Sequence, residues 1–114
     1  MVTIYHNPRC SKSRQTLALL EENNISPDVI LYLDTPPSAT DLQQLLSKLG
    51  ISARELLRKG EDAYKDNNLK NPELSEQQLI DAMVAHPKLI ERPIVVKGDK
   101  AVLGRPPENV LELV

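Results

Sequence analysis

Hydrophobic residues at the start of the chain form short groups separated by turn residues. The β-branched and aromatic residues over 2–5 predict a strand, which Asn7-Pro8 ends. Leucines at positions 17, 19 and 20 lie on a helix-forming background and predict a helix over 11–22. A second hydrophobic run over 28–33 predicts a strand parallel to the first, reached by a right-handed crossover. The chain is therefore expected to open with a βαβ unit.

The middle of the chain repeats one helix-start signal. A serine is followed three residues later by an acid or amide, as in a capping box, at Ser38/Asp41, Ser52/Glu55 and Ser75/Gln78. These signals predict helices from Ser38 to about Gly50, from Ser52 through Leu57, and from Ser75 to just before His86. Residues 59–72 are polar and predict a surface connection with at most a short helix.

The last quarter predicts a hairpin followed by a helix. Hydrophobic runs at 93–96 and 101–103 flank a turn at Gly98-Asp99, and Pro106-Pro107 precedes a final helix over 108–113. The order βαβ, helices, ββα is that of an α/β protein with a thioredoxin/glutaredoxin-like sheet and a helical insertion. We expect residues 1–114 to form a single domain, since one domain usually takes about 100 to 200 residues.

Charge and hydropathy narrow the function classes. The 114 residues include 14 Lys and Arg against 16 Asp and Glu, a net charge of −2, which argues against nucleic acid as a partner. No apolar run is long enough to span a membrane, and the first residues lack the apolar segment of an export signal. We therefore expect a cytoplasmic protein. Because the chain has no overall excess of positive charge, any anion-binding groups must form a local cluster.

The chain has a single cysteine, Cys10, between the first predicted strand and helix. With His6 and His86 as the only histidines, it can form neither an internal disulfide nor an ordinary zinc site, so no metal is expected. A helix start and nearby cations favour a thiolate, and these neighbours are Arg9, Lys12 and Arg14. A buried, inert cysteine is the alternative; the setting favours a reactive one.

Two familiar cysteine motifs are missing. A thioredoxin-type C-x-x-C pair would need a cysteine where Ser13 stands, and a phosphatase-type loop would need an arginine where Thr16 stands. The thiol therefore has no resolving partner within the chain. Any redox cycle must be completed by an external thiol.

Three arginines lie near chain breakers or helix ends, namely Arg58, Arg92 and Arg105. The planar guanidinium suits tetrahedral oxyanions, although each arginine taken singly is more typical of a solvated surface charge. The Arg92-Pro93 peptide is a candidate cis bond, because thioredoxin-like folds commonly place a cis proline beside the cysteine. If it is cis, we expect Arg92 to face Cys10.

Four segments together carry a family resemblance. They are His6-Asn-Pro-Arg-Cys10-Ser-Lys-Ser-Arg14, Leu-Leu-Arg58-Lys, Glu91-Arg-Pro-Ile-Val-Val96 and Gly104-Arg-Pro-Pro107. In this order and spacing they resemble the glutaredoxin-coupled arsenate reductase family (ArsC-like), and within it the YfgD-like branch. The resemblance runs from Ile4 to the C-terminus.

The resemblance implies a mechanism and a role for each motif residue. Cys10 is the expected nucleophile, Arg58, Arg92 and Arg105 are expected to bind the oxyanion, and His6, Ser13 and Arg14 are expected to tune the thiolate. The family's cysteine forms a thiol–arsenate adduct, which glutathione and glutaredoxin reduce to release arsenite. The implied partners are arsenate or a similar oxyanion, glutathione as co-substrate, and glutaredoxin. We expect a cytoplasmic monomer without a tightly bound cofactor.

Two alternatives remain open at the level of sequence. The first is a thiol oxidoreductase that acts on another oxyanion or on a disulfide. The second is a non-catalytic regulator similar to the Spx-type proteins on this fold, which bind RNA polymerase and usually carry C-x-x-C. Ser13 argues against the second alternative.

Overall fold

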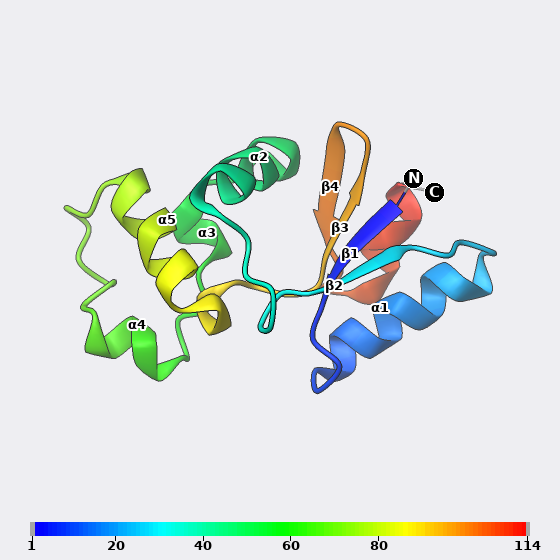
Figure 1. The fold of residues 1–114 in the computed structure, drawn as a ribbon, viewed down its shortest axis with the longest axis horizontal. Helices are drawn as coiled ribbons and strands as arrows, with labels where there is room; N and C mark the ends of the chain where they lie inside the picture. The colour runs from blue at the N-terminus through cyan, green and yellow to red at the C-terminus, as the bar shows by residue number, and fades with distance from the viewer. Residues whose placement is uncertain (1, 114) are drawn as a thin grey trace. The chain divides into compact units, whose positions relative to one another are not determined.

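The computed structural model describes residues 2–113 and divides the chain into two compact units (Figure 1). Unit 1 combines the chain up to Thr35 with the chain from Arg92 onward, and unit 2 is Pro36–Glu91. Each unit has buried hydrophobic residues of its own. That residues 1–114 act as one domain stays a prediction.

Unit 1 is built on a four-stranded mixed sheet with the strand order β2-β1-β3-β4. The central strand β1 pairs parallel with β2 and antiparallel with β3, which pairs antiparallel with β4. The strands are β1 (Val2–His6), β2 (Asp28–Leu31), β3 (Ile94–Lys97) and β4 (Lys100–Leu103). This confirms the expected α/β, thioredoxin-like arrangement of a βαβ unit and a terminal hairpin on one sheet.

One face of this sheet is covered by α1 (Ser11–Glu22) and the 3₁₀ helix η2 (Pro107–Glu112), which contact each other (Figure 1). Ile4 lies opposite both Val29 of β2 and Val95 of β3, so these side chains share a face. The core on this face consists of Val2, Ile4, Leu20, Val95 and Val110. Leu20, in the last turn of α1, packs the helix against this core.

Unit 2 is helical and corresponds to the predicted insertion. Its helices are α2 (Ala39–Leu49), α3 (Ala53–Leu56), α4 (Asp62–Asp66), α5 (Glu76–Ala85) and the 3₁₀ helix η1 (Pro87–Leu89). The three predicted capping boxes are confirmed, at Ser38, Ser52 and Ser75. Gly50 ends α2 in the left-handed conformation, with φ of 71°, which glycine adopts without strain. Helices α2, α3 and η1 all contact α5.

Two sequence predictions need correction. Strand β2 ends at Leu31, not at residue 33, because the Leu31 carbonyl accepts the N–H groups of Asp34 and Thr35 and the chain turns there. The last helix is 3₁₀ and begins at Pro107, with i→i+3 bonds from Asn109 N–H to Pro106 O and from Leu113 N–H to Val110 O.

Among residues 2–113, no helix has the length and apolarity needed to cross a membrane.

Candidate functional site

Cys10 is the N-cap residue of α1, with an extended backbone (φ −95°, ψ 124°) and a half-buried side chain. Its N–H donates to Asn7 O at 3.0 Å, and its carbonyl accepts the Arg14 N–H at 3.0 Å. The first turn of α1 contains no acidic side chain, so its outward N–H groups and the helix dipole favour negative charge at this end. Cys10 therefore lies at the N-terminus of a helix, as the sequence predicted.

A buried polar contact joins β1 to α1 on either side of the cysteine. His6 Nδ1 and Ser13 Oγ lie 2.6 Å apart, and Ser13 Oγ also accepts the Asn7 N–H at 3.0 Å. Both His6 and Ser13 are buried. Since buried polar groups are costly to leave without partners, this small network fixes the two ends of the Cys10 loop.

The environment of His6 disfavours its charged form. Burial, and then the nearby positive charge of Arg14, lower the pKa of the His6 imidazole below its ordinary value of 6.5. The ring is therefore neutral at pH 7 and exchanges a hydrogen bond with the Ser13 hydroxyl as an uncharged group. A neutral ring here positions the loop without adding a positive charge beside Cys10.

Arg14 and Asn7 hold the rest of the loop. The Arg14 guanidinium donates from Nη1 to the Pro8 carbonyl at 2.9 Å, and the Asn7 side chain accepts the Arg9 N–H at 3.0 Å. Arg14 is exposed and reaches back over the loop from the first turn of α1. All three residues expected to tune the thiolate thus contact the segment that carries Cys10, and their effect on the thiol stays a prediction.

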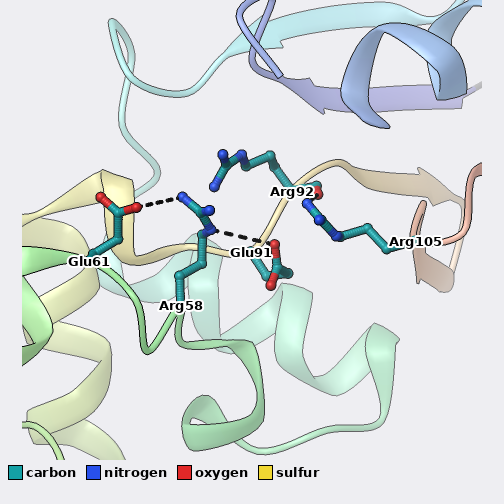
Figure 2. Close-up of polar contacts among 5 residues, drawn as sticks. All are labelled: Arg58, Glu61, Glu91, Arg92 and Arg105. Carbon is teal, nitrogen blue, oxygen red and sulfur yellow. Dashed lines mark hydrogen bonds and ion pairs between the residues drawn. The ribbon is translucent and has the colours of Figure 1, made fainter. Parts of the chain in front are cut away.

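Arg92 and Arg105 lie close together although they are far apart in the chain. Arg105 donates from Nη1 to the Arg92 carbonyl at 3.3 Å (Figure 2). Arg92 is half-buried with a buried Nε atom, and Arg105 is exposed. The Arg92-Pro93 peptide, a candidate cis bond from the sequence, is cis, and Arg105-Pro106 is cis as well. That Arg92 faces Cys10 stays a prediction.

Thr16 and Gly104 connect α1 to the segment that carries Arg105. The buried Thr16 hydroxyl lies 2.8 Å from Lys12 O and 3.2 Å from Gly104 O, so its one proton can be donated to either or shared between them, while Gly104 N–H donates to Pro93 O at 2.9 Å. A Cβ atom at Gly104 would lie 2.5 Å from Thr16 Oγ1 and 2.7 Å from Pro93 Cγ. Only glycine fits at this junction.

Arg58 belongs to unit 2 and follows the short helix α3. Its Nη1 lies 2.7 Å from a carboxylate oxygen of Glu61, and its Nε lies 3.6 Å from a carboxylate oxygen of Glu91 (Figure 2).

Sequence reasoning missed both carboxylates, as it missed Thr16 and the second cis peptide. Gly104, in the Gly104-Arg-Pro-Pro107 motif, was the available signal for the contact with Thr16. A glycine beside a strand often marks a place where another part of the chain approaches the backbone closely.

Metal ligation is not supported by the described part of the chain. Residues 2–113 contain no group of three or more His, Cys, Asp or Glu side chains arranged to hold a metal ion.

Comparison with known proteins identifies the family. Residues 5–113 match the model of the ArsC family. The chain belongs to the ArsC family. It is 62% identical over 114 residues to YfgD of Escherichia coli (strain K12), covering 99% of this chain and 96% of that protein. It is also 53% identical over 113 residues to an arsenate reductase of Haemophilus influenzae, covering 98% of this chain and 97% of that protein.

A solved structure of an ArsC relative matches the whole fold. An arsenate reductase from Vibrio cholerae superimposes with a TM-score of 0.97 at 54% sequence identity, covering 99% of this chain and 97% of that one. The family resemblance inferred from the four motifs is thus confirmed. The roles of the individual site residues stay predictions.

Proposed function

We propose that this ArsC-family protein reduces arsenate to arsenite, with Cys10 as the nucleophile. The observation that carries the proposal is the placement of its one cysteine, half-buried, at the N-cap of α1 beside the His6–Ser13 contact. The similarity to proteins named arsenate reductase supports the choice of substrate. A thiolate at this position is suited to attack on an electrophilic oxyanion.

The chemistry begins with substitution at arsenic. The Cys10 sulfur bonds to arsenic(V) and an arsenate oxygen leaves as water, giving a covalent thiol–arsenate adduct. Glutathione adds next and displaces a second oxygen, again as water. A glutaredoxin thiolate then attacks the glutathione sulfur, so that glutathione and glutaredoxin leave as a mixed disulfide. The electron pair of the broken bond stays on arsenic, which becomes arsenic(III) and leaves as arsenite on hydrolysis.

An external reductant follows from the thiol count. One cysteine can form the adduct but cannot expel it through an internal disulfide, so both electrons come from other molecules. Glutathione and glutaredoxin meet this need with one thiol each. Since the glutathione pool is held reduced in the cytoplasm, we place the reaction there.

The arginines supply the counter-charge in this proposal. Arg92 and Arg105 carry guanidinium groups on neighbouring segments of unit 1, joined by the Arg105–Arg92 hydrogen bond. We assign both to the arsenate oxyanion, and Arg58 of unit 2 to the same role by its place in the family motif. Preorganised guanidinium groups stabilise the charge that builds up on the oxygens as sulfur attacks.

The test is a coupled assay that follows NADPH oxidation in the presence of arsenate, glutathione, glutathione reductase and glutaredoxin. We expect sustained turnover by the native protein, none by Cys10→Ser, and none when thioredoxin and its reductase replace the glutathione system. Turnover with thioredoxin alone would contradict the reductant assignment. Turnover by Cys10→Ser would contradict the nucleophile.

A further inference from the structure

Three consecutive backbone carbonyls, those of Leu103, Gly104 and Arg105, lie within hydrogen-bond distance of side chains from α1 or η2. The Asn109 amide nitrogen donates to Leu103 O and to Arg105 O, both at 3.2 Å. The Thr16 hydroxyl lies 3.2 Å from Gly104 O. Because an amide group has two hydrogens, Asn109 can serve both of its carbonyls at once.

This segment lies where the sheet ends. The ladder between β3 and β4 ends at the pair formed by Ile94 and Leu103. A backbone carbonyl beyond the last ladder pair needs another donor. The Asn109 amide gives the Arg105 carbonyl such a donor and thereby fixes the path of the chain as it leaves the sheet.

The hydrophobic core holds the helix that carries Asn109. Asn109 belongs to η2, and the next residue, Val110, is fully buried in the core of unit 1. Pro107 is buried as well, and η2 contacts α1. The Asn109 N–H donates to Pro106 O at 3.0 Å, which closes the first turn of η2 directly after Arg105. The amide is therefore carried by a helix that is packed in place.

The residue whose position this contact sets is Arg105. Its carbonyl is bound by Asn109, and its guanidinium donates from Nη1 to the Arg92 carbonyl at 3.3 Å (Figure 2). An arginine carries its guanidinium at the end of a long side chain, so a small rotation of the backbone moves the guanidinium by a larger distance. A misplacement of about 1 Å in a substrate-positioning group can cost a reaction about 100-fold.

We propose that Asn109 is a positioning residue, which holds the backbone of Arg105 so that the guanidinium is placed for the oxyanion. The inference rests on the proposed function in one respect, the assignment of Arg105 to the oxyanion. It adds that the affinity for the oxyanion depends on an asparagine that acts through another residue. Asn109 and Arg105 both belong to unit 1.

The test measures how well sulfate protects Cys10 from alkylation by iodoacetamide at constant ionic strength. Asn109→Leu removes both amide donors and keeps a side chain of similar size, and Asn109→Ala removes them without adding bulk. Asn23→Leu is the control, because Asn23 is exposed and its amide also donates to a backbone carbonyl, that of Leu19, at the opposite end of α1 from Cys10. Thermal unfolding of each variant shows that it is folded.

We expect either Asn109 variant to raise the half-protecting concentration of sulfate about three- to ten-fold, the scale of one lost hydrogen bond, and Asn23→Leu to leave it unchanged. In turnover, the Asn109 variants should raise KM for arsenate more than they lower kcat. A merely structural loss of folded enzyme would lower kcat alone. Unchanged sulfate protection in both Asn109 variants would overturn the inference.

A double-mutant cycle with Arg105→Ala shows whether Asn109 acts through Arg105. If it does, Asn109→Leu has no further effect on sulfate protection once the guanidinium is gone. The same fold-change in both backgrounds would overturn the inference and leave the role of Arg105 intact.

The single variant Arg105→Ala separates the inference from the proposed function. If Arg105→Ala leaves sulfate protection unchanged, the assignment of Arg105 to the oxyanion fails and the inference fails with it. If the cycle behaves as expected but no arsenate is turned over, the positioning role of Asn109 is supported and the proposed substrate is contradicted.

Discussion

The Nδ1 atom of His6 lies 2.6 Å from the hydroxyl oxygen of Ser13, which ties the end of β1 to the first turn of α1. These two residues flank the Cys10 loop, His6 at the end of β1 and Ser13 in the first turn of α1. Both side chains are buried, so losing this contact would leave buried polar groups without a partner. The geometry of the proposed nucleophile therefore depends on a neutral histidine and a serine hydroxyl.

Replacing Ser13 with alanine should destabilise the protein. The Asn7 N–H and His6 Nδ1 would both lose a buried partner, which costs about 1 to 3 kcal/mol of unfolding free energy. Urea denaturation measures the loss. Ser11→Ala is the matched control, since Ser11 is exposed in the same turn of α1 and should change stability by less than about 0.5 kcal/mol. Equal losses in the two variants would contradict the buried network.

Stability should depend on pH through His6. The folded-state pKa of the imidazole is lowered below 6.5, so the unfolded chain binds more protons than the folded one as the pH falls from neutrality. The contribution of His6 to the free energy of unfolding is present above pH 6.5 and is lost as the pH falls through the folded-state pKa. His6→Gln should flatten this part of the pH dependence, measured by denaturation between pH 7.5 and 5, a range that brackets the ordinary histidine pKa of about 6.5.

The second histidine provides the control for that experiment. His86 is exposed, and His86→Gln should leave the slope of stability against pH close to that of the native protein. A steeper loss of stability at low pH that persists in His6→Gln would contradict the assignment to His6.

Alanine at Gly104 should be strongly destabilising. Its Cβ would lie 2.5 Å from Thr16 Oγ1 and 2.7 Å from Pro93 Cγ, so the junction between α1 and the Arg105 segment must shift. Overpacking of this kind costs about 1 to 3 kcal/mol, measurable as a fall in Tm. Gly60→Ala is the control, because nothing lies within 4 Å of the added Cβ. Similar Tm values for the two variants would contradict the close packing at Gly104.

Arg105→Ala should weaken oxyanion binding without unfolding the protein. The side chain is exposed, so its removal should change stability by less than about 0.5 kcal/mol, yet sulfate should protect Cys10 from alkylation less well. Arg105→Lys should restore protection only in part, because an ammonium lacks the bidentate fork. Lys100→Ala removes an exposed cation at the start of β4 and serves as the control. Unchanged sulfate protection in Arg105→Ala would identify Arg105 as an ordinary surface charge.

Local patterns explain why most elements could be predicted from the sequence. The capping boxes at Ser38, Ser52 and Ser75 and the glycine stop at Gly50 depend on residues within a few positions of one another. The last helix was harder to predict. The helix has only six residues, Pro107–Glu112, and its bonds close in the i→i+3 pattern; the sequence does not distinguish a short α-helix from a 3₁₀ helix.

The site was only partly predictable, for a physical reason. Cys10, His6 and Ser13 lie within one strand–loop–helix segment, so their proximity follows from local structure. The Thr16–Gly104 contact joins residues 88 positions apart, and the Arg58–Glu91 pair depends on a single backbone bridge. Such contacts arise from tertiary packing between distant segments; a glycine such as Gly104 can mark a close approach, but the sequence does not show which residue it meets.

The most direct test of the central claim is the appearance of arsenite itself. The native protein and Cys10→Ser are each incubated with arsenate, glutathione and glutaredoxin, and arsenate and arsenite are separated and quantified over time. We predict that arsenite accumulates with the native protein in stoichiometric proportion to the glutathione oxidised, and that Cys10→Ser stays at the rate of the protein-free mixture. Arsenite formation at the same rate in both proteins, or in neither, would contradict the claim that Cys10 reduces arsenate through a covalent adduct.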